Sequence, residues 1–162
     1  MRQHLRKGIQ LAKRRKRTSK NIPAKGRLRD MADRLWSRAV RDDWANRCAV
    51  CGKGNVEAHH LVPRQFEATR YNLLNGVSLC PSCHKFNPDV SPHLNASGWM
   101  DWLRYEHPIL AKWYTSNPRP EFHGTKNAAY YVAQIQRLRQ YVDEDDAEKI
   151  IGIKFISLLK ET

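Results

Sequence analysis

The stretch from Cys48 to His84, CAVCGKGNVEAHHLVPRQFEATRYNLLNGVSLCPSCH, decides the fold of this chain. It holds all four cysteines of the sequence as two Cys-x2-Cys pairs with 28 residues between them, Cys48 with Cys51 and Cys80 with Cys83. Histidines 59, 60 and 84 and asparagine 75 are interleaved with these pairs. The cysteines suit a soft metal ion, and the histidines suit a second, reactive metal ion.

The four thiols match the ligand number and spacing of a tetrahedral structural Zn2+ site. A Cys-x2-Cys turn directs both of its sulfurs to one point, and the long segment between the pairs lets the second pair complete the tetrahedron. Disulfides are the main alternative. We expect no signal peptide and no run of about 18 apolar residues that would span a membrane, and in a reducing compartment this spacing favours metal. A redox dithiol needs only one pair. We predict a structural zinc ion.

The sequence around the histidines predicts two strands and a short helix. Residues 56–62 form the first expected strand, which ends at a proline, and residues 77–79 form the second. Pro81 suits the first turn of a helix that continues through His84. Zinc would fix the start of the first strand and the start of this helix. His84 would then lie rigidly opposite the His59–His60 pair, as a catalytic metal with open positions and a neighbouring base requires.

In this register the stretch resembles an HNH endonuclease, a ββα-metal nuclease, of the subgroup held together by two Cys-x2-Cys pairs. The matching residues are His-His-x2-Pro and Asn-x-Val-x-Leu-Cys-x2-Cys-His. The resemblance implies that His59 and His84 hold a catalytic divalent ion and that His60 is the general base. It also implies that Asn75 fixes the loop that orients this base. Each residue also has a structural alternative to its catalytic role. The His59–His60 pair is then an ordinary feature of a strand, Asn75 with Gly76 forms a turn, and His84 lies beside the zinc site without binding a metal.

The sequence departs from the family at one ligand position. Some members carry a further histidine one helical turn after the position of His84, where this chain has Pro88. The resemblance therefore implies two histidine ligands, completed by water and phosphate oxygens, with His93 as a possible substitute. A weakly held Mg2+ or Mn2+ ion supplied from solution fits this set.

Positive charge is concentrated ahead of the first cysteine pair. Residues 1–47 hold 16 Lys and Arg against 4 Asp and Glu, whereas residues 48–162 hold 13 against 12. A basic arm on a nearly neutral body indicates a polyanionic partner, and we expect Arg14, Arg15 and Arg17 to contact DNA phosphates. The arm lacks the apolar spacing of a core element, so it is expected to be disordered or helical only when bound. A solvated tail or an import signal is the alternative.

Three further cations lie inside or next to the module. Arg64 and Arg70 belong to the polar segment between the expected strands, and Lys85 follows His84. We expect all three to bind phosphate or to stabilise the transition state.

Helical spacing of apolar residues extends over residues 27–44 and predicts one buried face: Leu28, Met31, Ala32, Leu35, Trp36, Ala39 and Val40. Shorter patterns cover 97–105, 108–114 and 126–142. The arginines of the first helix, Arg34, Arg38 and Arg41, lie opposite its apolar face, where they are solvated or extend the basic surface. Residues 147–160 fit either a helix or a strand.

The expected fold class is α+β, a zinc-stapled ββα-metal module flanked by α-helices with a basic N-terminal arm. We divide the chain into the arm (1–26), a nuclease domain with its preceding and following helices (27–116) and a C-terminal helical extension (117–162).

Together these features predict a metal-dependent DNA endonuclease that leaves 5′-phosphate and 3′-hydroxyl ends. Residues 31–41 also resemble phage recombination endonucleases of the NinG/Rap type. That resemblance implies a cytoplasmic enzyme for branched DNA, with a second copy or another recombination protein as partner. No membrane association is expected. The alternatives are a general nicking or packaging-associated HNH nuclease and a non-catalytic zinc module that only binds nucleic acid.

Overall fold

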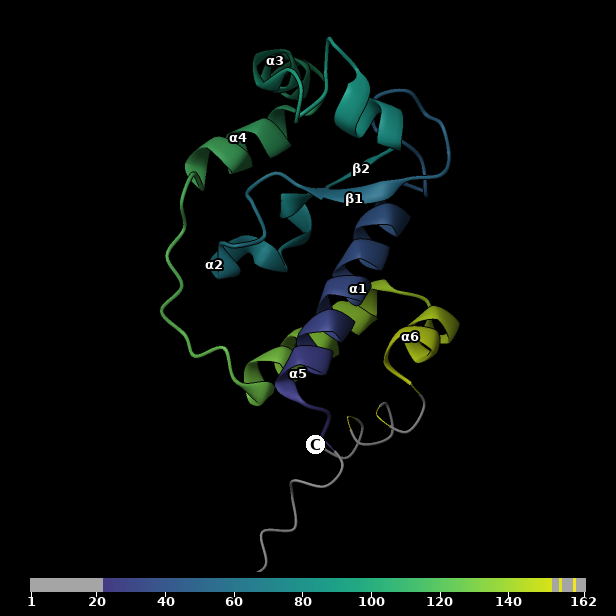
Figure 1. The fold of residues 1–162 in the computed structure, drawn as a ribbon, viewed down its shortest axis with the longest axis vertical. Helices are drawn as coiled ribbons and strands as arrows, with labels where there is room; N and C mark the ends of the chain where they lie inside the picture. Colours follow the sequence, from purple (N-terminus) through teal and green to yellow (C-terminus); the bar gives the residue numbers. More distant parts are fainter. Residues whose placement is uncertain (1–21, 153–154, 156–158, 160–162) are drawn as a thin grey trace, which may run out of the picture.

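The computed structural model describes residues 22–152, 155 and 159, and Figure 1 shows how its elements are arranged. The predictions for most of the basic arm, including Arg14, Arg15 and Arg17, lie outside the described residues. The same holds for most of the predicted element after residue 152. No helix among the described residues is long and apolar enough to cross a membrane.

Helix α1 (Lys25–Asp43) is the element against which the two halves of the molecule pack. It confirms the helix predicted from apolar spacing, and its buried face is the predicted one: Leu28, Met31, Ala32, Leu35, Trp36, Ala39 and Val40. Figure 1 shows α1 running from the C-terminal helices up to the β-sheet. The sheet and the C-terminal helices both pack on this apolar stripe, so α1 fixes where they lie relative to each other.

The sheet is a two-stranded antiparallel hairpin of β1 (Glu57–His60) and β2 (Gly76–Leu79). Both strands were predicted, although β1 is shorter than residues 56–62. Gly76 pairs with His60 and lies so close to α1 that a Cβ atom there would be 2.2 Å from Cγ2 of Val40. Only glycine allows this approach, and it seats the hairpin directly on the helix.

The segment between the strands contains more structure than the loop predicted from its polarity. It forms the short helix α2 (Glu67–Arg70) and the turn η1 (Leu73–Asn75). After β2 the predicted helix is a single wide turn, η2 (Ser82–Phe86), in which the amide of Asn87 donates to the carbonyl of Ser82. The order strand, strand, helical turn is the predicted one.

Two helices cover the module and two more pack on α1. Helices α3 (Ala96–Glu106) and α4 (Pro108–Ser116) share a core with β2 and with three of the four cysteines, Cys48, Cys80 and Cys83. Helices α5 (Ala128–Leu138) and α6 (Glu144–Ile151) share a second core with α1. The turn η3 (Arg139–Tyr141) follows α5 directly. The fold is α+β and mostly helical, as expected, and residues 144–151 adopt the helical alternative. The division of the chain at residues 26 and 116 stays a prediction.

Candidate active site

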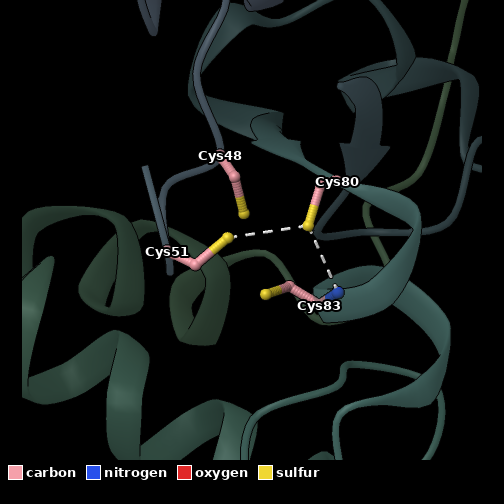
Figure 2. A group of neighbouring side chains, drawn as sticks. All are labelled: Cys48, Cys51, Cys80 and Cys83. Carbon is pink, nitrogen blue, oxygen red and sulfur yellow. Dashed lines mark hydrogen bonds between the residues drawn. The ribbon is translucent and has the colours of Figure 1, made fainter. Parts of the chain in front are cut away.

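The four cysteines converge on one point beside the hairpin (Figure 2). Cys48 and Cys51 precede β1, Cys80 follows β2, and Cys83 lies on η2. All four sulfurs lie within 4.8 Å of one another, and those of Cys51 and Cys80 are 3.7 Å apart. A tetrahedron with Zn–S bonds of about 2.3 Å has edges of about 3.8 Å. A disulfide would need about 2.05 Å, and all four cysteines are free.

The protonation chemistry of these thiols also fits a cation. Burial raises the pKa of Cys48, but backbone N–H groups, among them that of Cys80, outweigh this effect and lower it to about 7. Burial and the neighbouring thiols raise the pKa of Cys83. Crowded sulfurs oppose each other's ionisation, and a bound cation removes that opposition because it requires thiolates as ligands. The group therefore has the donor set, the spacing and the charge demand of a structural metal site.

A second cluster brings together three imidazoles from three different segments. His59 lies on β1, His84 on η2 and His93 on the loop before α3. Nε2 of His84 lies 2.9 Å from Nδ1 of His59 and 3.0 Å from Nε2 of His93. Neighbouring ligands of an octahedral ion with bonds of about 2.1 Å are about 3 Å apart, so this spacing is consistent with a metal site. His93, which the sequence offered only as a possible substitute ligand, lies with the two predicted histidines.

The hydrogen bonding of His84 shows why these rings suit a cation better than one another. Nδ1 of His84 lies 2.5 Å from Oε1 of Glu57. A carboxylate only accepts, so Nδ1 carries the proton and Nε2 has at most one lone pair to offer. That lone pair cannot accept from both His59 and His93, whereas a metal ion satisfies all three nitrogens. Burial, followed by the neighbouring histidines, lowers the pKa of His59 to about 3, which keeps its ring neutral and able to bind metal.

His60 follows His59 on β1 but has different surroundings. Its ring stacks on Trp36 of α1, with centroids 3.6 Å apart and planes 15° from parallel. Its Nε2 lies 3.0 Å from the carbonyl oxygen of Arg70, so Nε2 donates and Nδ1 keeps a free lone pair. Burial lowers the pKa of His60 to about 4. The ring is therefore neutral at physiological pH and able to accept a proton.

Asn75 is completely buried and ties both ends of the segment between the strands. Its Oδ1 accepts from the amide of Val62 at 2.6 Å, and its Nδ2 donates to the carbonyls of Val62 and Thr69 at 3.0 and 3.1 Å. Thr69 precedes Arg70, whose carbonyl contacts His60. Asn75 therefore holds the segment whose Arg70 carbonyl contacts His60, and it also ends the turn η1. Its role in catalysis stays a prediction.

The three cations predicted to bind phosphate have different surroundings. Arg64 is exposed. Arg70 forms a bidentate pair with Asp33 of α1, at 2.6 and 2.8 Å, and also donates to the carbonyl of Arg64. This pairing raises the pKa of Arg70. Lys85 lies 3.0 Å from the Glu57 carboxylate that also contacts His84.

A cleft of about 550 Å3 connects the histidines. His59, His60, His84, His93 and Arg64 line it, and helices α3 and α4 contribute an apolar wall: Ala96, Trp99, Met100 and Tyr114. Trp99 belongs mainly to the core, because it is only 5% exposed. The candidate ligands and the candidate base therefore face one solvent-connected space large enough for part of a substrate.

Several contributors to this site were not predicted. Glu57 had a usable signal, because it precedes His59 by two residues and alternate residues of a strand share a face. Trp36 and Asp33 had none, because their contacts with His60 and Arg70 join parts of the chain that lie far apart in sequence.

Residues 48–87 match the family model described as HNH endonuclease. No curated protein and no solved structure matches the chain. Residues 48–87 thus form a domain that matches the HNH endonucleases, a family of phosphodiester hydrolases, and this domain carries a four-cysteine metal-binding cluster.

Proposed function

We propose that the chain is a metal-dependent DNA endonuclease with two metal sites of different character. Cys48, Cys51, Cys80 and Cys83 hold a structural Zn2+ ion, and the three-histidine cluster holds a labile catalytic ion, Mn2+ or Mg2+. The observation that carries this proposal is the spacing of 2.9 and 3.0 Å around Nε2 of His84, in the same cleft as His60. A set of three imidazoles favours Mn2+ of the two ions, because Mg2+ prefers oxygen ligands.

Each residue of the site has a separate role in the proposed reaction. When bound, the divalent ion supplies positive charge to the phosphate and to the departing 3′ oxygen. Nδ1 of His60 accepts a proton from the attacking water, whose oxygen bonds to phosphorus as the P–O3′ bond breaks. The departing 3′ oxygen takes a proton from solvent water, so the products are a 5′-phosphate and a 3′-hydroxyl. The carbonyl of Arg70 and the face of Trp36 hold the His60 ring in the orientation that this step needs. Asn75 and the Asp33–Arg70 pair hold the segment that carries this carbonyl.

Arg64 is the residue we propose for direct phosphate contact in the cleft. It lines the cleft and is exposed, and no hydrogen bond or ion pair holds its guanidinium within the described part of the chain. Lys85 is exposed beside Glu57 and adds positive charge near His84. Arg70 is already bound by Asp33, so its contribution is through the loop rather than through a free guanidinium.

A plasmid nicking assay tests the activity. The zinc-loaded protein should convert supercoiled plasmid to nicked or linear forms with Mn2+ or Mg2+ and should leave it intact with EDTA. Absence of cleavage with every ion, together with normal DNA binding, would favour the alternative of a non-catalytic binding module.

The substrate shape needs a separate comparison. Activity on branched DNA in phage recombination, in the cytoplasm, is supported only by the resemblance of residues 31–41 to NinG/Rap-type enzymes. Faster cleavage of a synthetic four-way junction than of a linear duplex of the same sequence supports this proposal. Equal rates favour a general nicking or packaging-associated nuclease.

A further inference from the structure

A second cleft, of about 400 Å3, lies between α1 and α6, apart from the histidine cleft. Four cations line it, Arg34, Arg38, Arg41 and Lys149, together with two acids, Asp33 and Asp146. Its volume falls within the range of ordinary ligand sites. Its lining is far more basic than the nearly neutral part of the sequence from residue 48 onward.

The acids near this cleft are already bound to cations. Arg38 pairs with Asp146 at 2.6 Å and with Asp42 at 2.7 Å. Lys149 also pairs with Asp146, and Asp33 pairs with Arg70. The ion pairs therefore leave Arg34 and Arg41 without a partner among residues 22–152.

Arg41 carries the clearest sign of a missing ligand. Its Nε is buried and has no hydrogen-bond partner within the described part of the chain. A buried guanidinium N–H without an acceptor is costly, and an anion entering the cleft would remove that cost. Arginine binds phosphate oxygens through a planar fork of N–H groups, which makes a phosphate the fitting ligand.

The cleft is also connected to the catalytic site. Asp33 lines it, and the same carboxylate holds Arg70, whose carbonyl contacts His60. Two consecutive contacts thus join the wall of this cleft to the candidate base.

We propose that Arg34 and Arg41 form a phosphate-binding site for the nucleic-acid backbone, separate from the catalytic cleft. This inference rests on the proposed function, because the phosphates belong to the substrate of the nuclease. The site provides affinity and register without reading sequence, since backbone phosphates are alike at every step.

Salt-dependent binding of duplex DNA to the zinc-loaded full chain tests this site. Binding is measured by fluorescence anisotropy over a series of KCl concentrations, without added Mg2+ or Mn2+. For duplex DNA the slope of log K against log salt changes by about 0.9 for each phosphate that the protein no longer neutralises. Arg34→Gln and Arg41→Gln should each lower the slope by about that amount and weaken binding on the order of tenfold. The double variant should lower the slope by about 1.8.

A matched control separates a site from general charge. Arg119→Gln with Lys126→Gln removes the same charge from two exposed positions in the segment between α4 and α5. It should leave the slope nearly unchanged. An equal loss of slope in the control and in the Arg34/Arg41 double variant would overturn the proposal, as would wild-type binding by the double variant. Arg34 is exposed, so Arg34→Gln keeps the test valid if the half-buried Arg41 variant melts early.

A competition arm identifies the source of the phosphate. Inorganic phosphate at constant ionic strength should not abolish the difference between wild type and the double variant. If it does, the cleft is a site for a free anion, and the backbone proposal is wrong. Because binding requires no strand cleavage, the two proposals fail separately. If wild type cleaves DNA and the double variant keeps the wild-type salt slope, only the phosphate site in this cleft is refuted. If the double variant loses slope as predicted but wild type does not cleave DNA, only the nuclease activity is refuted.

Discussion

The carboxylate of Glu57 lies 2.5 Å from Nδ1 of His84, on the side of the ring opposite the nitrogen that faces His59 and His93. Hydrogen bonding to His84, followed by Lys85, lowers the pKa of Glu57 and keeps it ionised. This geometry fixes the proton of His84 on Nδ1 and orients the ring so that Nε2 faces the other two histidines, as outer carboxylates do at metal-binding histidines.

Replacement of this carboxylate tests its effect on the metal. Glu57→Gln removes the charged acceptor but keeps the shape of the side chain, so affinity for Mn2+ should fall roughly 10- to 100-fold. Mn2+ titrations followed by cleavage rate and by calorimetry measure this change. Lys85→Gln is the matched control, because it removes the other partner of Glu57 and leaves the contact with His84. Equal metal affinity in wild type and Glu57→Gln would exclude the role.

Removal of His93 distinguishes a three-histidine site from the two-histidine site that the sequence favoured. His93→Ala should raise the Mn2+ concentration needed for half-maximal cleavage by at least tenfold, because one of three nitrogen ligands is lost. His123→Ala serves as the control, since His123 is exposed and pairs only with Glu121 among the described residues. An unchanged Mn2+ requirement in His93→Ala would support the two-histidine set.

Loss of a thiolate should affect the fold rather than the chemistry. Cys80→Ser removes one ligand from a cluster that joins the segment before β1 to the turn η2. The module should lose its zinc and its cooperative melting transition, because binding energy at a structural zinc site contributes directly to folding. Zinc content and melting by circular dichroism report both effects, with the neighbouring Ser82→Ala as control. A zinc-free variant that melts like wild type would show that the thiols do not stabilise the module.

Arg70 and Arg64 should respond to mutation in opposite ways. Arg70→Gln breaks the pair with Asp33, whose side chains are 12% and 31% exposed, and should cost about 1–3 kcal/mol of stability. It should lower kcat and leave DNA affinity nearly unchanged, because the guanidinium supports the loop that orients His60. Arg64→Gln should weaken DNA binding and leave the melting temperature unchanged. If Arg70→Gln instead weakens binding as strongly as Arg64→Gln, Arg70 contacts phosphate directly.

The parts of the site that the sequence predicts are those encoded by local spacing. Two Cys-x2-Cys turns each present two sulfurs, and Pro81, directly before the first residue of η2, allows the helical turn to begin soon after β2. The amphipathic pattern of α1 is equally local, and it identified all seven buried residues of that helix.

His93 could not be assigned from spacing because its position depends on how one loop folds. The hydroxyl of Ser91 donates to the carbonyl of His84 and accepts from the amides of His93 and Leu94. These bonds turn the chain back so that His93 faces His84. Arg70 is a comparable case. The sequence shows only a cation in a polar loop, and its partner Asp33 comes from a helix that lies far away in sequence. Contacts of this kind depend on tertiary structure, which no local pattern contains.

The most direct test of the account compares wild type with His60→Ala for cleavage of supercoiled plasmid in Mn2+, with DNA affinity and Mn2+ affinity measured on the same samples. Removal of a general base should slow cleavage on the order of 100- to 10,000-fold while both affinities stay within a factor of about two. Cleavage by His60→Ala at a rate close to that of wild type would contradict the central claim that this imidazole activates the attacking water.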